Sequence, residues 1–191
     1  MASVLGMFDV FSLKEFQDAT RPFALSPVPN PNASRKFSIV RTLVGIHNVP
    51  HLGVQTTSLA GDTDSAIVQR TWGLLSSTPS RKDEFYGPNL TFTEFMKPKN
   101  WFHGIAMHWG LMVAGLFLII PVARKAVRHF VIQPGQGPDV EQTKTQDLEF
   151  RGVALPDPPD STGKQVYCRA YFTGGMYYCK RFESIYIRTA H

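Results

Sequence analysis

Cysteine is scarce in this sequence: the 191 residues contain two, Cys168 and Cys179. Two cysteines cannot build the disulfide framework of a small secreted domain, so free thiols in a reducing compartment are expected. The first residues, MASVLGMFDVF, place no basic region before their apolar residues, and Asp9 interrupts them early. This pattern predicts no secretory signal, and the two Asn-x-Ser/Thr triplets are therefore interpreted as chance matches.

The short motifs that mark common catalytic and cofactor sites are also missing. The sequence has no G-x-S-x-G, no H-E-x-x-H, no C-x-x-C and no G-x-G-x-x-G between a strand and a helix. We therefore assign no catalytic residue, no metal ligand and no cofactor-binding residue. The net charge is +5, but the cations are scattered except after residue 123 and no nucleic-acid-binding signature occurs. No nucleic acid partner is expected.

Four histidines form two closely spaced pairs in the sequence. His47 and His51 are four residues apart with a proline between them, which favours a loop pair over a metal site. His103 and His108 would lie about 140° apart around a helix, so a shared metal ion is not expected. His108 stands inside an apolar run, where a functional role and a hydrogen-bonded structural role are both open.

The main positive feature is the uncharged apolar run over residues 104–123, GIAMHWGLMVAGLFLIIPVA. As an α-helix it would be about 30 Å long, the thickness of a bilayer's hydrocarbon core. A core helix in a domain of this size normally keeps a polar stripe, so membrane association is favoured over core burial. The run is at the short end for a spanning helix, and spanning or lying in one leaflet stays open.

Basic and aromatic residues border this run, as they do at membrane–water interfaces. Three cations follow it and two lysines, Lys97 and Lys99, precede it, so the charge difference gives little indication of orientation. Three cations are fewer than an anionic-lipid cluster usually has, which favours a plain membrane stop signal. The residues expected to contact a lipid membrane are Trp101, Trp109, Leu116, Phe117, Ile119, Arg124, Lys125 and Arg128.

The rest of the chain mixes helical and strand patterns. Residues 2–19 and 62–76 have helical spacing, and in the second helix Asp62 or Asp64 is expected to be an N-cap rather than half of an acid–base pair. Its apolar stripe is predicted to leave Gln69 and Arg70 outside. Residues 37–46 fit a helix and a strand equally well.

The expected fold class is α+β. One small, mostly antiparallel sheet is predicted to include residues 90–96, 147–155 and 164–173, with the two helices packed on it and a long helix projecting at 101–130. The predicted divisions are 1–100, a membrane helix with its basic flank at 101–130, and a strand-rich part at 131–191 with an atypical tail.

Five stretches, taken in order, resemble the C-terminal half of the saccharopine dehydrogenase-like oxidoreductases. This membrane-associated group is often called the trans-acting enoyl reductases, and the chain is most similar to the fungal type. The stretches are ASVLGMFDVFSLKEFQDATRPFALSP, DTDSAIVQRTWGLL with its Arg70-Thr71 pair, YGPNLTFTEFM, VIQPGQGPDVEQTKTQDLEFRGVA, and KQVYCRAYFTGGMYY. They cover about residues 2–178, and the tail CKRFESIYIRTAH departs from the family pattern.

This resemblance implies an NAD(P)-dependent hydride-transfer enzyme of lipid or glycolipid metabolism. The implied location is a lipid droplet or an intracellular membrane, with the mitochondrion and the plasma membrane as alternatives. The family's N-terminal Rossmann domain has no counterpart here, so no cofactor is expected on this chain. It would be inactive alone, or would need a Rossmann-containing partner or a homo-oligomer, and helix 2–19 would carry unpartnered apolar surface. The alternatives are a non-enzymatic membrane adaptor and a truncated gene product.

Overall fold

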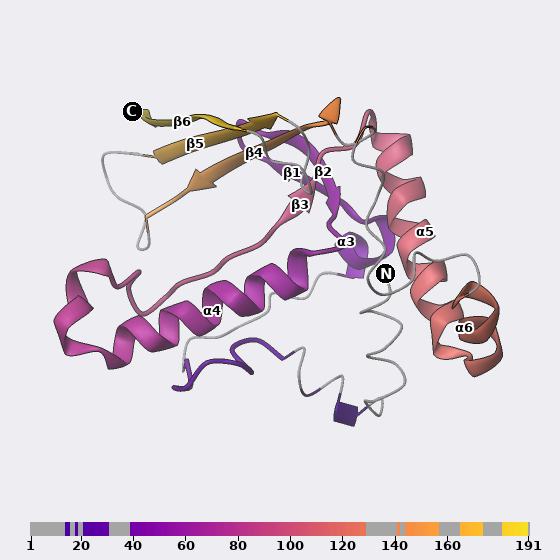
Figure 1. The fold of residues 1–191 in the computed structure, drawn as a ribbon, viewed down its shortest axis with the longest axis horizontal. Coiled ribbons are helices and arrows are strands. Elements are labelled where there is room, and N and C mark those ends of the chain that lie inside the picture. Colours follow the sequence, from indigo (N-terminus) through magenta and orange to yellow (C-terminus); the bar gives the residue numbers. More distant parts are fainter. Residues whose placement is uncertain are drawn as a thin grey trace. The chain divides into compact units, whose positions relative to one another are not determined.

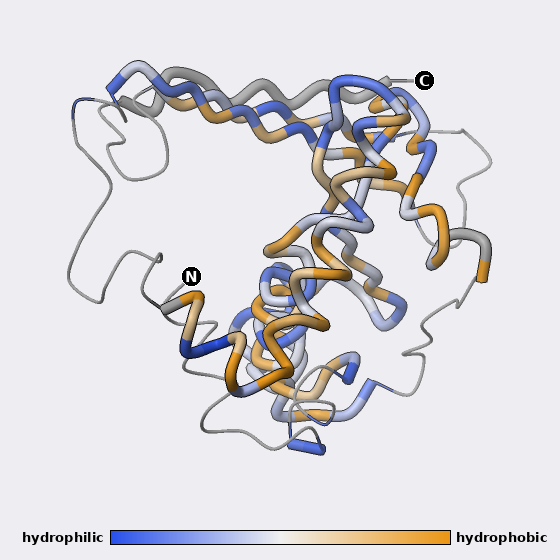
Figure 2. Tube along the Cα trace, turned by 90° about the vertical axis from the view of Figure 1, so that its right-hand side faces the viewer, coloured by the Kyte–Doolittle hydropathy of each residue, from blue (hydrophilic) through white to orange (hydrophobic). Residues whose placement is uncertain are grey.

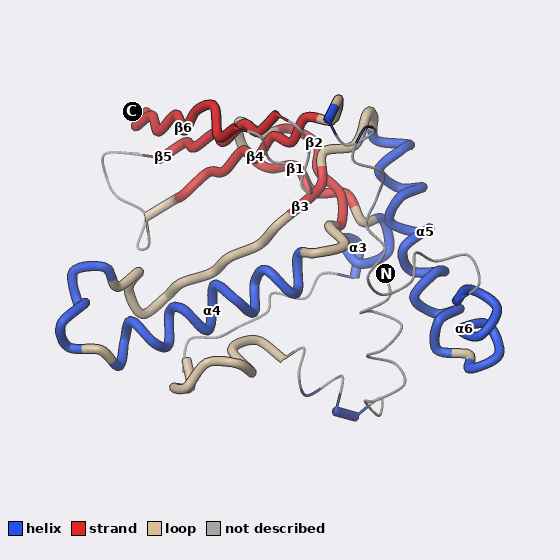
Figure 3. The backbone as a smooth tube through the Cα atoms, viewed as in Figure 1, coloured by secondary structure: helices blue, strands red, loops and turns tan. Residues whose placement is uncertain are grey.

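The computed structural model describes residues 14, 15, 18, 21–30, 39–128, 141, 144–156, 165–173 and 181–190, and for 40, 41, 128 and 181–190 it describes the backbone alone. These residues form helices and two small antiparallel sheets, an α+β fold (Figures 1 and 3). Most of the predicted helix 2–19, with its expected apolar surface, and the predicted loop 133–139 lie outside the described residues.

The chain divides into two compact units. The helical unit comprises Ser3–Val49 and Val54–Ala126, and the strand unit comprises Val127–His191 with Met1–Ala2 and Pro50–Gly53. The first series of elements is α3 (Ile39–Val44), β1 (Ile46–Val49), β2 (Gly53–Thr57), α4 (Gly61–Ser77), η1 (Pro79–Glu84), β3 (Phe95–Met96), α5 (Trp101–Ile119) and α6 (Pro121–Arg128). The second series is β4 (Asp147–Ala154), β5 (Gln165–Thr173) and β6 (Arg181–Ala190).

Helix α4 confirms the helical pattern over 62–76, and its buried centre is Trp72. The Trp72 ring makes edge contact with Phe23 at 5.1 Å between centroids, and its Nε1–H donates to the Gly87 carbonyl at 2.7 Å. The segment between η1 and β3 returns alongside α4 (Figure 1). The prediction that Gln69 lies outside is wrong, because its Oε1 accepts the Phe23 N–H at 2.6 Å. The segment between α4 and β3, which contains Gly87, thus packs against Trp72 of this helix.

Residues 37–46, which fitted both patterns, contain a short helix and the start of a strand. Helix α3 ends at Val44, and Gly45 follows it with φ 67°, the left-handed conformation that glycine adopts most readily after a helix. Gly45 connects α3 to β1. The six residues of α3 are too few for the pattern in the sequence to separate helix from strand.

The prediction of one sheet is wrong, because the strands fall into two. The first has the order β1-β2-β3, with Thr57 of β2 opposite Phe95 of β3. The second has the order β4-β5-β6, and both of its pairings are antiparallel. The strands predicted at 147–155 and 164–173 are confirmed with their antiparallel pairing, whereas only two residues of 90–96 are a strand.

Candidate functional site

Helix α5 is the described element with the most unusual surface. It is long and apolar enough to cross a membrane. Its most apolar 18-residue stretch has a mean hydropathy of 1.6, yet only 11% of that stretch is buried. A core helix would be mostly buried, so within the described residues α5 is not one. Hydrophobic colours predominate along it (Figure 2). The predicted membrane residues on it are exposed, with Leu116 at 70%, Phe117 and Trp101 at 52%, Trp109 at 47% and Ile119 at 42%.

One stripe of α5 is covered, and it belongs to the helix's first two turns. Gly104 and His108 are the buried residues of α5. A Cβ atom added to Gly104 would lie 2.6 Å from Ile46 Cδ1, and one added to Gly45 would lie 2.0 Å from His108 Cγ. Both values are below any normal contact, so the two glycines allow α5 to approach the turn between α3 and β1 closely.

His108 joins α5 to the first sheet and to α3. Its Nε2 lies 2.9 Å from the Thr42 carbonyl oxygen, which can only accept, so Nε2 carries a proton and donates it. Its Nδ1 lies 2.8 Å from Thr57 Oγ1, a hydroxyl that can donate to this nitrogen or accept from it. Of the two roles left open, this geometry favours the hydrogen-bonded structural one, because both ring nitrogens are engaged. His103, five residues earlier, is exposed.

Thr56 completes the same polar cluster. This residue is fully buried, and its hydroxyl lies 2.8 Å from the Gly104 carbonyl oxygen and 3.0 Å from that of Gly45. Buried polar groups need such partners, since an unpaired one costs about 1–3 kcal/mol. The cluster of Thr42, Thr56, Thr57 and His108 therefore fixes the first two turns of α5 against the sheet.

The predicted helix over 101–130 is interrupted, because α5 ends at Ile119 and Pro121 opens α6. Proline lacks the N–H that would continue the helical ladder, and it is favoured in a first turn. Arg124 reaches back from α6 and donates to the Leu118 and Ile119 carbonyls at 3.0 and 3.1 Å. Lys125 is exposed on α6, and the side chain of Arg128 lies outside the described residues.

The predicted N-cap of α4 is wrong. Ala60 occupies the cap position without a side-chain bond, and Asp62 and Asp64 lie in the first helical turn. Glu94 lies beside this turn and accepts the Ser58 hydroxyl at 2.6 Å. Partial burial raises the pKa of Glu94, and a hydrogen bond with Asp64 raises it further. Asp64 is thus paired with Glu94, which is 30 positions away in the sequence.

The two described junctions that lead from a strand into a longer helix do not suit a nucleotide phosphate. After β2, the first turn of α4 carries Asp62 and Asp64, whose charges repel an anion. After β3, Asn100 Oδ1 accepts the His103 N–H at 2.8 Å and occupies the end of α5. A nicotinamide cofactor therefore does not fit these junctions. In the part of the chain that the structure describes, no group of three or more His, Cys, Asp or Glu could hold a metal ion.

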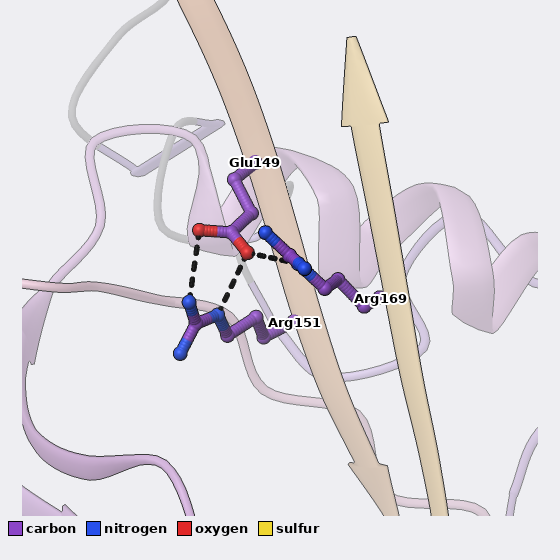
Figure 4. A network of polar contacts seen from close by, with 3 residues as sticks. All are labelled: Glu149, Arg151 and Arg169. Atoms are coloured by element: carbon purple, nitrogen blue, oxygen red, sulfur yellow. Dashed lines mark hydrogen bonds and ion pairs between the residues drawn. The ribbon is translucent and has the colours of Figure 1, made fainter. Parts of the chain in front are cut away.

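The strand unit carries a polar network on β4 and β5 that sequence reasoning missed. Arg151 and Arg169 lie directly opposite each other, and Glu149 bonds both guanidinium groups (Figure 4). The Arg151 Nε–H and Nη2–H donate to the two carboxylate oxygens of Glu149 at 2.9 and 3.1 Å. The Arg151 bonds lower the pKa of Glu149, with help from Arg169. Because like charges opposite each other destabilise a sheet, Glu149 is interpreted as a structural bridge.

No protein-family model, curated protein or solved structure matches this chain. The resemblance to the saccharopine dehydrogenase-like oxidoreductases consequently stands on the five sequence stretches alone. The arrangement that the structure adds is one apolar helix, fixed at its first two turns to a small sheet and exposed over the opposite face.

Proposed function

We propose that this chain is a membrane-associated protein whose α5 binds lipid. The observation that carries the proposal is the exposed apolar face of α5, in which large side chains face outward while a histidine and a glycine are buried. Contiguous exposed apolar surface of this kind marks interaction sites with membranes or proteins. Lysines flank the face on both sides, Lys97 and Lys99 before it and Lys125 after it, and all three are exposed.

The resemblance sharpens this proposal to the membrane-bound, substrate-side half of a saccharopine dehydrogenase-like oxidoreductase acting on a lipid-like molecule. In that role the chain depends on a Rossmann-containing partner for NAD(P), since its own described strand-to-helix junctions repel or block a phosphate. The support is the order of the five stretches in the sequence. No step of the hydride transfer is assigned to a residue of this chain.

The membrane proposal is tested by flotation of the purified full chain with vesicles of phosphatidylcholine and phosphatidylserine. We expect the chain to rise with the vesicles in a density gradient. A chain that stays in the aqueous fraction, without detergent and without aggregation, contradicts the proposal.

The oxidoreductase proposal needs a separate experiment, because half an enzyme is inactive alone. The chain is mixed with, or fused to, the nucleotide-binding domain of a fungal member of the family, and NAD(P)H oxidation is followed with enoyl lipids. Turnover that requires both parts supports the proposal. Flotation without any turnover in the fused protein favours the alternative, a non-enzymatic membrane adaptor.

A further inference from the structure

The two sides of α5 differ in what covers them. At about 100° per residue, the exposed side chains of Phe102, Trp109, Val113, Leu116 and Phe117 cluster on one side of the helix. Most of the less exposed residues lie roughly opposite them: Gly104, Met107, His108, Leu111, Gly115 and Leu118. Ile105 is the exception, because it is partly buried but lies near Leu116 on the helix. One side of α5 thus packs against the protein over the first two turns, at Gly104 and His108, and the other side is apolar and open.

A helix that crosses a bilayer is surrounded by acyl chains over its whole apolar length. Residues 104–108 of α5 are instead bonded to Thr42, Thr56 and Thr57. If α5 were perpendicular to the membrane, the part of the sheet bonded to it, including the buried Gln55, would lie in the hydrocarbon layer. Polar backbone and side chains are expensive there, which disfavours the spanning arrangement.

The part of α5 beyond this attachment is too short to cross alone. The stretch from Trp109 to Ile119 rises about 16 Å, roughly half of a 30 Å hydrocarbon core. The chain then turns at Ile120 and Pro121 into α6, where Arg124 binds the last carbonyls of α5. The charged residues at both ends of α5 can reach head groups together if the helix lies parallel to the surface.

We infer that α5 lies in the plane of one leaflet, with the side of Phe102, Trp109, Val113, Leu116 and Phe117 in the acyl layer and the side of Gly104 and His108 toward water. The occupant of this surface is the acyl region of a single phospholipid leaflet. The inference rests on the proposed membrane association and specifies its geometry. It places the β1-β2-β3 sheet outside the hydrocarbon layer.

Spin-label depth measurements test this geometry on the full chain. Cys168 and Cys179 are replaced by serine, and single cysteines are placed at Phe102, Val113 and Phe117 on the open side and at Met107 and Leu118 on the covered side. Each labelled protein is bound to phosphatidylcholine–phosphatidylserine vesicles. The collision rates with oxygen and with a water-soluble nickel complex then give the depth of each label.

An in-plane helix gives similar depths at 102, 113 and 117 and much shallower labels at 107 and 118, so that depth follows the helical period. A spanning helix gives one maximum near the middle and shallow labels at both ends whatever their side, and that result overturns the inference while leaving the membrane proposal intact. Protein that does not float with vesicles overturns both. If M107C disturbs the fold by circular dichroism, L118C supplies the same comparison.

Discussion

Helices α4 and α5 have similar lengths, 17 and 19 residues, and opposite relations between composition and burial. The more polar α4 buries Trp72 and Leu75. The more apolar α5 buries Gly104 and His108 and leaves most of its large apolar side chains exposed. The hydrophobic effect in water favours the arrangement of α4, in which large apolar side chains are buried. The arrangement of α5 suits a helix whose outer side contacts another apolar medium.

The largest expected effect contrasts Trp72 of α4 with Trp109 of α5. Trp72→Ala should lower the free energy of unfolding by about 3–5 kcal/mol, because a buried ring and its bond to Gly87 are lost. Trp109→Ala, on the exposed side of α5, should change it by about 0.5 kcal/mol or less. Urea unfolding in a mild detergent, followed by circular dichroism, measures both. Equal losses for the two variants would remove the contrast.

The next effect contrasts two exposed leucines, Leu116 of α5 and Leu74 of α4. Leu116→Glu puts a carboxylate on the open side of α5 and should weaken vesicle binding by about 2–3 kcal/mol, or about 30- to 150-fold. The matched control is Leu74→Glu, since Leu74 is 47% exposed on α4. This control should bind vesicles as the unaltered protein does. Flotation across a series of lipid concentrations gives the affinities, and similar losses for both would point to non-specific adhesion.

A third contrast uses two histidines of α5. His108→Ala removes the ring's hydrogen bonds to the Thr42 carbonyl and to the Thr57 hydroxyl and should cost about 1–3 kcal/mol of stability. The matched variant His103→Ala changes an exposed side chain and should stay within about 0.5 kcal/mol. Thermal unfolding of both variants in the same detergent is the measurement. An unchanged His108→Ala protein would contradict the structural role given to this residue.

The smallest effect concerns Glu94, which precedes β3 and lies beside the first turn of α4. Its pKa is raised in the fold above the ordinary value near 4.5, so the folded state holds the proton more tightly than the unfolded chain does. This contribution to stability is complete below about pH 4.5 and is lost as the pH rises through the raised pKa. Glu94→Gln should remove that loss, so its melting temperature should fall less than that of the unaltered protein between pH 4 and 7. A larger fall in the variant would contradict the assignment.

Local patterns in the sequence predicted the elements whose signal is contained in a few neighbouring residues. The alternation in 164–173 and 147–155 located two strands and their pairing, and the helical spacing over 62–76 located α4. Which strand joins which sheet depends on contacts between distant residues, and for this reason residues 95 and 96 were assigned to the wrong sheet.

The attachment of α5 could not be predicted for the same physical reason. The bonds of His108 connect it to residues 51 and 66 positions away, and no local spacing signals them. The four-residue interval between Gly104 and His108 was the available sign, because it places a small residue and a polar one on one side of an apolar helix. The break at Pro121 was also visible in the sequence, as a proline inside a predicted helix.

Strand β6 places residues 181–190, which lie in the tail predicted to be atypical, in the second sheet. It pairs with β5 from Arg181 opposite Thr173 to Ala190 opposite Gln165, with one irregularity on the way. A chain without residues 181–190 would turn β5 from a central strand into an outer one. Its backbone N–H and C=O groups would then be open to the corresponding strand of another molecule, the usual route to edge-to-edge polymerisation.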